Sequence, residues 1–284
     1  MSAITTRKVC ICGAGTMGSG IAQVAAQAGI PTVLYDLSAD VLEKAKKSIS
    51  QSLQSLVAKG KITTDQETYI FNQILFTGNL KDCIADVIIE AVVEKPEVKI
   101  DLFNSLARQN DPGCIFASNT SSLSVSEIAQ KINNPARVIG MHFFNPAPVM
   151  KLVEVVNTPD THADVTAAII SLAKQMGKSP VVCKDSPGFI VNRVARPYYL
   201  ESLRLAEEGV VDMEEMDLLL EATGFKMGPF KLMDLIGNDI NYAVSTSLYD
   251  QLHTPERLRP SAIQEMKVKE GKLGKKTGEG YYKY

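Results

Sequence analysis

Short, nearly continuous apolar runs alternate with amphipathic helical patterns along the first two thirds of the chain. The run at 86–93 is almost entirely apolar, which is typical of a strand covered by helices on both faces. Strands are predicted at about 8–12, 32–36, 87–93, 114–118, 137–143, 151–156 and 180–184. The alternation of strands and helices predicts an α/β fold with a mostly parallel sheet.

A helical pattern interrupts this alternation after the second predicted strand. Its apolar stripe recurs at helical spacing and ends at a Lys-Gly-Lys turn, and a second short helix is expected at about 64–73. The stripe consists of Leu42, Ala45, Ile49, Leu53 and Leu56. We interpret the two segments as an inserted helical hairpin that projects from the sheet.

The pattern becomes entirely helical after residue 184. Helices are predicted at about 189–208, 213–222, 230–236, 239–251 and 260–270, separated by Pro and Gly. We therefore predict two domains, an α/β domain over 1–184 and a smaller all-α domain over 185–284, joined at Asp185–Gly188. Lysines near the C-terminus are interspersed with glutamates, which favours a solvated surface over a phosphate site.

A glycine signature lies at the end of the first predicted strand. It reads Gly13-Ala-Gly15-Thr16-Met17-Gly18, and a helix of small residues and a second strand follow. The first glycine allows a tight turn, the second lets a pyrophosphate approach, and the third lets the helix lie close to the sheet. The first N–H groups of that helix suit a phosphate. This context predicts a Rossmann-type dinucleotide site, although a glycine-rich turn that binds nothing has the same local pattern.

Asp36 ends the second strand, about 20 residues after the glycines. A carboxylate at this position accepts hydrogen bonds from the ribose hydroxyls of adenosine and repels a 2′-phosphate. No arginine follows in 36–40. The sequence therefore favours NAD over NADP.

Composition excludes several classes of protein. The chain has 284 residues, 45% of them hydrophobic, a net charge of -2 and five cysteines, and its pI is about 6.0. This argues against nucleic acid as the main partner, and no apolar run is long enough to cross a membrane. Met1 to Lys8 leads straight into the first strand, so we expect no signal peptide and a reducing, cytoplasmic location. Cys10-x-Cys12 resembles a metal or redox pair, but core packing is favoured because both side chains share one face of a buried strand.

His142 is the histidine best placed for chemistry. It lies at the carboxyl end of a predicted strand, where the crevice of an open α/β sheet is found. Oxidation of an alcohol needs a base for the hydroxyl proton, and histidine titrates near neutral pH. Glu154 is an acid in the next apolar strand, and a chain reversal could bring it beside the imidazole. The pair predicts a catalytic dyad. Taken separately, a histidine and a glutamate at these positions are equally typical of residues with a purely structural role.

Two further polar segments, at 117–122 and 189–193, are candidates for binding substrate oxygen and the cofactor amide. Their spacing alone is equally typical of helix caps or loops.

The chain resembles the L-3-hydroxyacyl-CoA dehydrogenase family over essentially its whole length, and within it the bacterial 3-hydroxybutyryl-CoA dehydrogenases. The resemblance rests on long motifs in one order: the glycine signature, 118–122, 142–154, 185–193, 227–229 and 274–280. It implies dimerisation through the helical domain, and it leaves acyl-chain length open.

The resemblance also implies roles for individual residues. It implies that His142 is the base, that Glu154 orients it, and that Ser121 and Asn192 bind the substrate oxygen. Glu94, Lys99 and Asn119 are implied to lie along the NAD ribose and nicotinamide. The resemblance further implies that Ser52 and Lys59 on the hairpin contact coenzyme A.

The expected activity is the reversible, NAD-dependent interconversion of (S)-3-hydroxybutanoyl-CoA and acetoacetyl-CoA. One alternative is a dehydrogenase of a free hydroxy or sugar acid such as gulonate, for which Arg193 or Arg196 could bind the carboxylate. The other is a protein that binds NAD without turnover. The expected assembly is a homodimer or a higher homo-oligomer.

Overall fold

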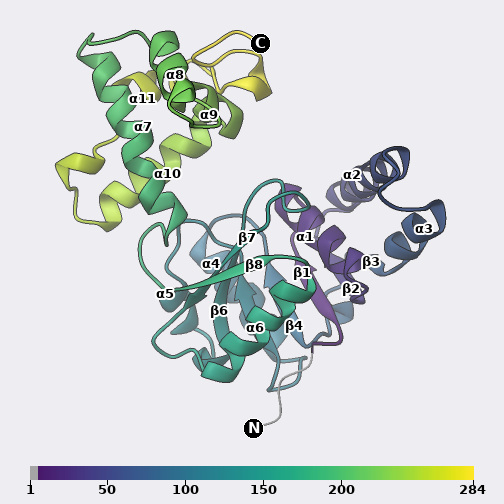
Figure 1. The fold of residues 1–284 in the computed structure, drawn as a ribbon. Helices are drawn as coiled ribbons and strands as arrows, with labels where there is room; N and C mark the ends of the chain where they lie inside the picture. Colours follow the sequence, from purple (N-terminus) through teal and green to yellow (C-terminus); the bar gives the residue numbers. More distant parts are fainter. Residues whose placement is uncertain (1–5) are drawn as a thin grey trace. The chain divides into compact units, whose positions relative to one another are not determined.

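The computed structural model describes residues 6–284 and contains two compact units, Met1–Asp185 and Ser186–Tyr284. Figure 1 shows the course of the chain through each unit. We expected no signal peptide from the sequence of residues 1–8. Residues 1–5 of that segment lie outside the described residues.

An eight-stranded sheet forms the centre of the first unit, in the order β3-β2-β1-β4-β5-β6-β7-β8. Neighbouring strands are parallel except β6 and β7, which are antiparallel. The strands are β1 (Val9–Cys12), β2 (Thr32–Tyr35), β3 (Ile74–Thr77), β4 (Val87–Glu90), β5 (Ile115–Ser118), β6 (Val138–Phe143), β7 (Leu152–Asn157) and β8 (Ser179–Lys184). The predicted α/β fold with a mostly parallel sheet is confirmed.

The structure corrects the sequence-based prediction at two strands. Strand β3 was not predicted; it is an edge strand that follows a helix directly and leaves Leu75 half exposed, so its apolar pattern is weak. Strand β4 ends at Glu90, whereas the apolar run predicted a strand up to residue 93.

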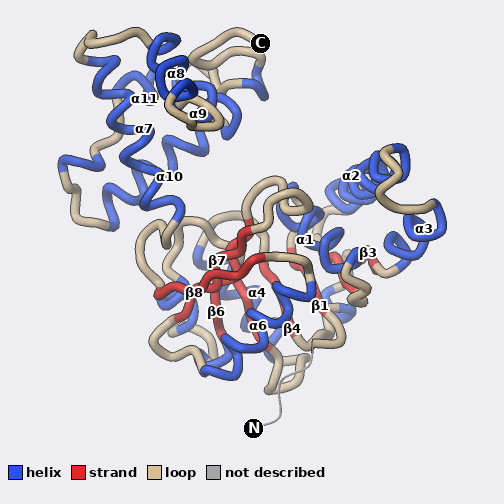
Figure 2. The backbone as a smooth tube through the Cα atoms, in the orientation of Figure 1, coloured by secondary structure: helices blue, strands red, loops and turns tan. Residues whose placement is uncertain are grey.

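Helices cover the sheet of the first unit (Figure 2). They are α1 (Thr16–Gln27), α2 (Ala39–Ala58), α3 (Thr64–Asn72), α4 (Pro96–Ala107), α5 (Val125–Ala129) and α6 (Ala163–Gln175), with 3-10 turns η1 (Leu80–Asp82) and η2 (Pro135–Arg137). The main apolar cluster joins strands β1, β2, β4 and β7 to helices α1, α2 and α6. Odd-numbered residues of β1, Val9 and Ile11, belong to this cluster, as strand alternation requires.

Helices α2 and α3 form the predicted hairpin beside the β3 edge of the sheet (Figure 1). Four of the five residues in the predicted stripe are buried, and Leu56 packs against them from a partly buried position. Ser38 caps α2 through its side chain, and a reciprocal capping box of Thr63 and Gln66 starts α3. The stripe is part of the main apolar cluster and so packs the hairpin against the rest of the unit.

The second unit is helical. Its elements are α7 (Val191–Glu207), α8 (Met213–Ala222), α9 (Pro229–Ile236), α10 (Asn238–Gln251) and α11 (Ala262–Lys269), with 3-10 turns η3 (Glu256–Leu258) and η4 (Lys275–Thr277). The predicted helices agree with these to within about two residues, which is ordinary precision for helix ends. An apolar cluster around Phe230 and Met233 forms the core of this unit.

Two buried aspartates account for the glycines of the C-terminal motifs. Asp217 accepts hydrogen bonds from the backbone N–H groups of Phe230 and Lys231 and so satisfies the start of α9. A side chain on Gly228 would overlap Asp217. Asp234 accepts hydrogen bonds from the backbone N–H groups of Tyr281 and Tyr282 near the C-terminus. A side chain on Gly280 would overlap the carboxylate of Asp234. These motifs therefore stabilise the helical unit.

Across residues 6–284 the structure contains no helix that is both long and apolar enough to cross a bilayer.

Candidate active site

The candidate residues of the first unit lie where the strands end. Register pairs Tyr35 with Cys12, Cys12 with Glu90 and Glu90 with Ser118, so four parallel strands end at one level. The residues that follow them in the chain are therefore brought to one edge of the sheet. This is where open α/β sheets bind their ligands.

The glycine signature forms the turn between β1 and α1. Gly13 has a φ of 100°, and a side chain there would overlap the backbone of Ala91 on the neighbouring segment. A side chain on Gly18 would overlap the carbonyl group of Gly13. Gly15 differs, because no heavy atom of the described residues lies within 4 Å of the position that its Cβ would take. The open space beside Gly15 fits a ligand that approaches the backbone closely.

Helix α1 presents an electropositive end at this turn. Gly15 is its N-cap, and the first turn carries no acidic residue. Thr16 is exposed and Met17 is half-buried. The first N–H groups of a helix lack helical partners, so this end suits a phosphate group.

Asp36 follows β2 directly and lies beside the glycine turn. Its Oδ2 accepts a hydrogen bond from the N–H of Ala14 at 2.8 Å, and its Oδ1 accepts one from the N–H of Ser38 at 2.9 Å. These bonds fix the carboxylate next to the turn, which is where the ribose of a dinucleotide needs an acceptor.

A buried ion-pair network lies beneath the next strand ends. Lys99 of α4 is 1% exposed, and its Nζ donates to Glu90 Oε1 at 2.6 Å and to Glu94 Oε2 at 2.9 Å. Ser118 also donates its hydroxyl to Glu90, at 2.7 Å. Burial raises the pKa of Glu90, although Lys99 acts in the opposite direction. For Glu94, burial also acts to raise the pKa, but Lys99 and the hydrogen bonds outweigh it and the pKa is lowered.

Glu94 connects this network to the predicted substrate segment. It accepts hydrogen bonds from the Thr120 hydroxyl at 2.5 Å and from the Ser121 N–H at 3.1 Å. Asn119 lies at the end of β5, and its Oδ1 accepts a hydrogen bond from the N–H of Phe143 at 2.8 Å. The structure thus brings together Glu94, Lys99, Asn119 and Ser121.

His142 and Glu154 face each other across the antiparallel pair β6–β7. They are direct register partners, and Nδ1 of the imidazole lies 2.7 Å from Oε2 of the carboxylate. The histidine is 5% exposed and the glutamate 1%. The ring of Phe144 packs on the imidazole at a centroid distance of 4.6 Å. A carboxylate at this distance fixes the tautomer and orientation of the ring and stabilises its charged form.

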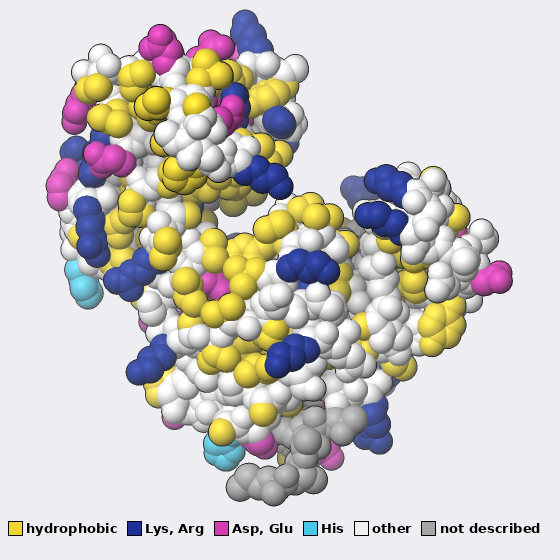
Figure 3. Space-filling model, viewed as in Figure 1, with side chains coloured by type: hydrophobic (Ala, Val, Ile, Leu, Met, Phe, Trp, Pro, Cys, Tyr) yellow, Lys and Arg dark blue, Asp and Glu magenta, His cyan; other side chains and the backbone are white. Residues whose placement is uncertain are grey.

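A groove of about 400 Å³ runs between the start of α1, helix α2 and the 145–148 loop. Gly15 and Thr16 line one side, and Lys44 and Ser52 line the other. Lys59 is the exposed C-cap of α2 and does not line the groove. Lysine side chains gather over the hairpin in the space-filling view (Figure 3), and the hairpin sequence contains no arginine.

The remaining candidates belong to the helical unit. Asn192 lies in the first turn of α7 and is half-buried. Arg193 donates to the hydroxyl of Ser186 at 3.2 Å. Arg196 is buried, and burial lowers its pKa to about 10. Its guanidinium donates to the carbonyls of Asn192 and Asn241 and to the hydroxyl of Ser245, so the expectation that Arg196 is available for an anion is wrong.

The sequence analysis gave Glu90 no role in this site, and it included Ser118 and Thr120 only as members of the polar segment 117–122. One signal was present: Glu90 is an acid inside an otherwise apolar strand, which predicts a buried partner. Nothing local identified Lys99 as that partner.

Comparison with known proteins agrees with this geometry. The model of the 3-hydroxyacyl-CoA dehydrogenase NAD-binding domain matches residues 8–186, and the model of the C-terminal domain of the same family matches residues 188–284. The chain belongs to the 3-hydroxyacyl-CoA dehydrogenase family. Its first unit is accordingly an NAD-binding domain, and the predictions of the family and of NAD as cofactor are confirmed.

Members of this family resemble the chain over its whole length. It is 47% identical to the 3-hydroxyadipyl-CoA dehydrogenase of Escherichia coli over 98% of the chain, but it spans only 59% of that enzyme. It is 40% identical to the mitochondrial hydroxyacyl-coenzyme A dehydrogenase of Sus scrofa over 99% of the chain and 92% of the relative. The crystal structure of (S)-3-hydroxybutyryl-CoA dehydrogenase from Ralstonia eutropha matches with a TM-score of 0.94 and 37% identity, covering 99% of both chains.

Proposed function

We propose that the protein interconverts (S)-3-hydroxybutanoyl-CoA and acetoacetyl-CoA with NAD⁺ and NADH. The observation that carries the proposal is the buried His142–Glu154 pair at the sheet edge that also holds the glycine turn and Asp36. An acid–base pair beside a dinucleotide site is what the oxidation of a secondary alcohol needs.

In the oxidative direction, His142 takes the hydroxyl proton of the substrate. Because Nδ1 faces Glu154, the proton is exchanged at Nε2. Bound NAD⁺ supplies the acceptor for the hydride that leaves C3. Glu154 stabilises the imidazolium that results, since an ion pair in a buried site is worth more than in water. In the reductive direction, protonated His142 polarises the ketone and returns the proton.

The other side chains hold the reactants. Ser121 and Asn192 bind the oxygen on C3, while Asn119, Glu94 and Lys99 support the ribose and nicotinamide side of NAD. Lys99 is buried between two carboxylates, so it acts through Glu94 and the turn after β4. Ser52 lines the groove beside the glycine turn, and Lys59 adds positive charge for the phosphates of coenzyme A.

The names of the relatives leave two acyl chains to compare, hydroxybutyryl and hydroxyadipyl. We favour the four-carbon substrate because relatives named for it match this chain over 99% of their own length, whereas the chain spans only 59% of the hydroxyadipyl enzyme. The free hydroxy acid alternative loses one of its two candidate arginines, because the guanidinium of Arg196 is bonded inside the helical unit. The other, Arg193, donates to the Ser186 hydroxyl.

We further propose that the protein is a cytoplasmic homodimer associated through the helical unit. Exposed apolar side chains on α8, α9 and α10 support this assembly; they include Leu218, Leu219, Leu235 and Ile240.

The test is oxidation of NADH with acetoacetyl-CoA, followed by NADH absorbance. Free acetoacetate, 3-oxoadipyl-CoA and NADPH serve as comparisons. Rapid oxidation with acetoacetyl-CoA and NADH, and slow oxidation in the other three reactions, is expected. Faster turnover of 3-oxoadipyl-CoA than of acetoacetyl-CoA would identify the longer diacid thioester as the preferred substrate. NADH binding without turnover of any thioester would contradict the proposal.

A further inference from the structure

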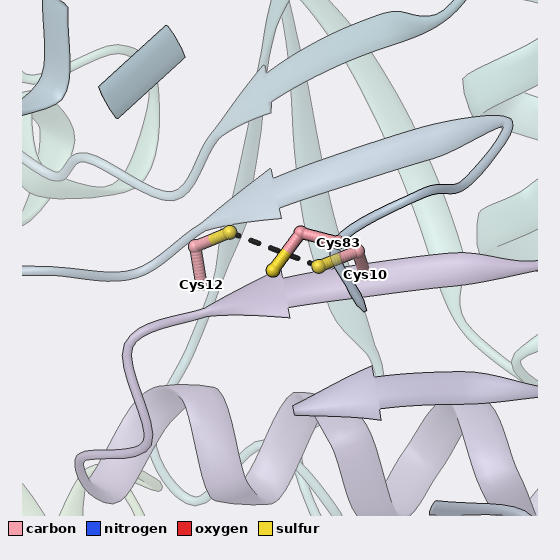
Figure 4. Close-up of side chains that lie close together, drawn as sticks. All are labelled: Cys10, Cys12 and Cys83. Carbon is pink, nitrogen blue, oxygen red and sulfur yellow. Dashed lines mark hydrogen bonds between the residues drawn. The ribbon is translucent and has the colours of Figure 1, made fainter. Parts of the chain in front are cut away.

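Three cysteine side chains meet inside the first unit, away from the catalytic pair. Cys10 and Cys12 come from β1, and Cys83 comes from the segment between η1 and β4. All three sulfur atoms lie within 4.8 Å of one another, and the Sγ atoms of Cys10 and Cys12 are 3.8 Å apart (Figure 4). None of the three side chains is exposed to solvent.

The fold holds these thiols together from two directions. Residues 10 and 12 are separated by one position on β1, so they project from the sheet face opposite to Val9 and Ile11. The segment of Cys83 is fixed by the buried amide of Asn110, which donates to the carbonyl of Cys83 at 2.9 Å and accepts from the N–H of Ala85 at 3.0 Å. The cluster is therefore held in place by the fold on both sides.

The spacing of the sulfur atoms suits a shared metal ion. A metal–thiolate bond of about 2.3 Å places neighbouring sulfur ligands about 3.7–4 Å apart around one ion. The 3.8 Å between Cys10 and Cys12 falls in this range. Among residues 6–284, no histidine or carboxylate joins these three thiols as a fourth candidate ligand at this position.

The number and type of ligands select the metal. Structural zinc is held by four ligands, and a three-ligand zinc site adds water. The cluster offers three thiols, and none of them is exposed to solvent. Thiolates prefer soft ions such as Cu(I). We propose that Cys10, Cys12 and Cys83 form a three-coordinate thiolate site for a soft monovalent ion of the Cu(I) type. Each thiol that becomes a ligand releases its proton to the solvent.

The site would link two parts of the NAD-binding domain. Cys12 directly precedes Gly13, and Cys83 lies on a segment that ends at Asp86, which is hydrogen-bonded to Lys8 just before β1. An ion bound to all three thiols fixes this segment to the strand, so occupancy raises the thermal stability of the folded state. Ile84 is half exposed beside Cys83, so opening of this short segment gives the ion a route to the thiols.

The experiment is an anaerobic titration of the reduced full-length protein with Cu(I) against a chromophoric Cu(I) chelator. Wild type is compared with Cys83→Ala and with Cys114→Ala, which removes a buried cysteine outside the cluster. NADH affinity and the thermal midpoint of each metal-free variant establish that it is folded. Copper X-ray absorption of the wild type counts the sulfur neighbours without any substitution.

We expect one Cu(I) per chain in wild type and in Cys114→Ala, three sulfur neighbours, and a raised thermal midpoint on loading. In Cys83→Ala, the affinity should fall at least tenfold. Failure of the wild type to compete with the chelator would overturn the proposal. So would binding that survives in Cys83→Ala, a coordination shell with nitrogen or oxygen, or displacement of Cu(I) by equimolar Zn²⁺.

Discussion

His142 and Glu154 are cross-strand partners, with Nδ1 and Oε2 2.7 Å apart in a buried antiparallel pair. Their separation is set by the register of β6 against β7. A one-residue slip would turn one side chain to the other face of the sheet, so register is strongly determined where both faces are covered. The rigid strands therefore hold the acid–base pair in position.

Glu154→Gln should lower kcat by less than His142→Ala, which removes the proton acceptor and should cost about 10²–10⁴-fold. The glutamine keeps the shape but no longer stabilises the imidazolium, and it allows the wrong tautomer. Steady-state kinetics with acetoacetyl-CoA and NADH give both values. Full turnover in either variant would remove that residue from the proposed mechanism.

Gly15→Ala should weaken NADH binding at least tenfold with a loss of less than about 1 kcal/mol in the free energy of unfolding, the usual difference at an N-cap. The protein leaves open space at this Cβ position, so the added methyl group meets the cofactor. Gly18→Ala is the matched variant, because its methyl group overlaps Gly13 and should destabilise the fold as well. NADH titration and urea unfolding separate the two effects. Equal NADH affinity in Gly15→Ala and wild type would mean that the pyrophosphate does not lie there.

Asp36→Ala should reduce the preference for NADH over NADPH. The carboxylate accepts from Ala14 and Ser38 beside the glycine turn, where it repels a 2′-phosphate. The measurement is the ratio of kcat/KM for the two cofactors. If the ratio stays at the wild-type value, another group reads the ribose.

Lys99→Met should destabilise the first unit by about 3–5 kcal/mol, the usual cost of leaving a buried charge without its partner. Glu90 is fully buried and would be the orphaned group. Adding Glu90→Gln should recover part of the loss, and Lys95→Met at the exposed start of α4 should have little effect. Urea unfolding without cofactor is measured for wild type, the single variants Lys99→Met and Glu90→Gln, the double variant and Lys95→Met. A loss in the double variant equal to the sum of the single losses would show that the pair is not coupled.

The stabilising effect of Glu94 should depend on pH. Its pKa is lowered in the folded protein, so its contribution is complete above the unfolded pKa of about 4.3 and is lost as the pH falls through the folded value. The stability difference between wild type and Glu94→Gln should therefore shrink on acidification. Glu90→Gln is the opposite control: its raised pKa means that wild type loses stability relative to this variant as the pH rises through the folded value. A stability difference between wild type and Glu94→Gln that stays the same at every pH would contradict this assignment.

Much of the fold was predictable because it depends on the spacing of apolar residues and glycines within short stretches of the chain. The glycine signature, the strand before it and Asp36 lie within one short stretch, and their periodicity indicates a strand, a helix and a second strand. The change to helical patterns after residue 184 is equally local. His142 could be selected because it ends a predicted strand, where such sheets bind their ligands.

Other features were decided only by the tertiary structure. The order and register of the strands bring Cys83 to Cys10 and place Lys99 beneath Glu90, although these residues are far apart in the chain or on different elements. Burial of Arg196 likewise depends on α10 packing against α7. A linear sequence reveals periodicity within an element, but which elements meet depends on the packing of the whole unit, because the same local pattern is compatible with many neighbours.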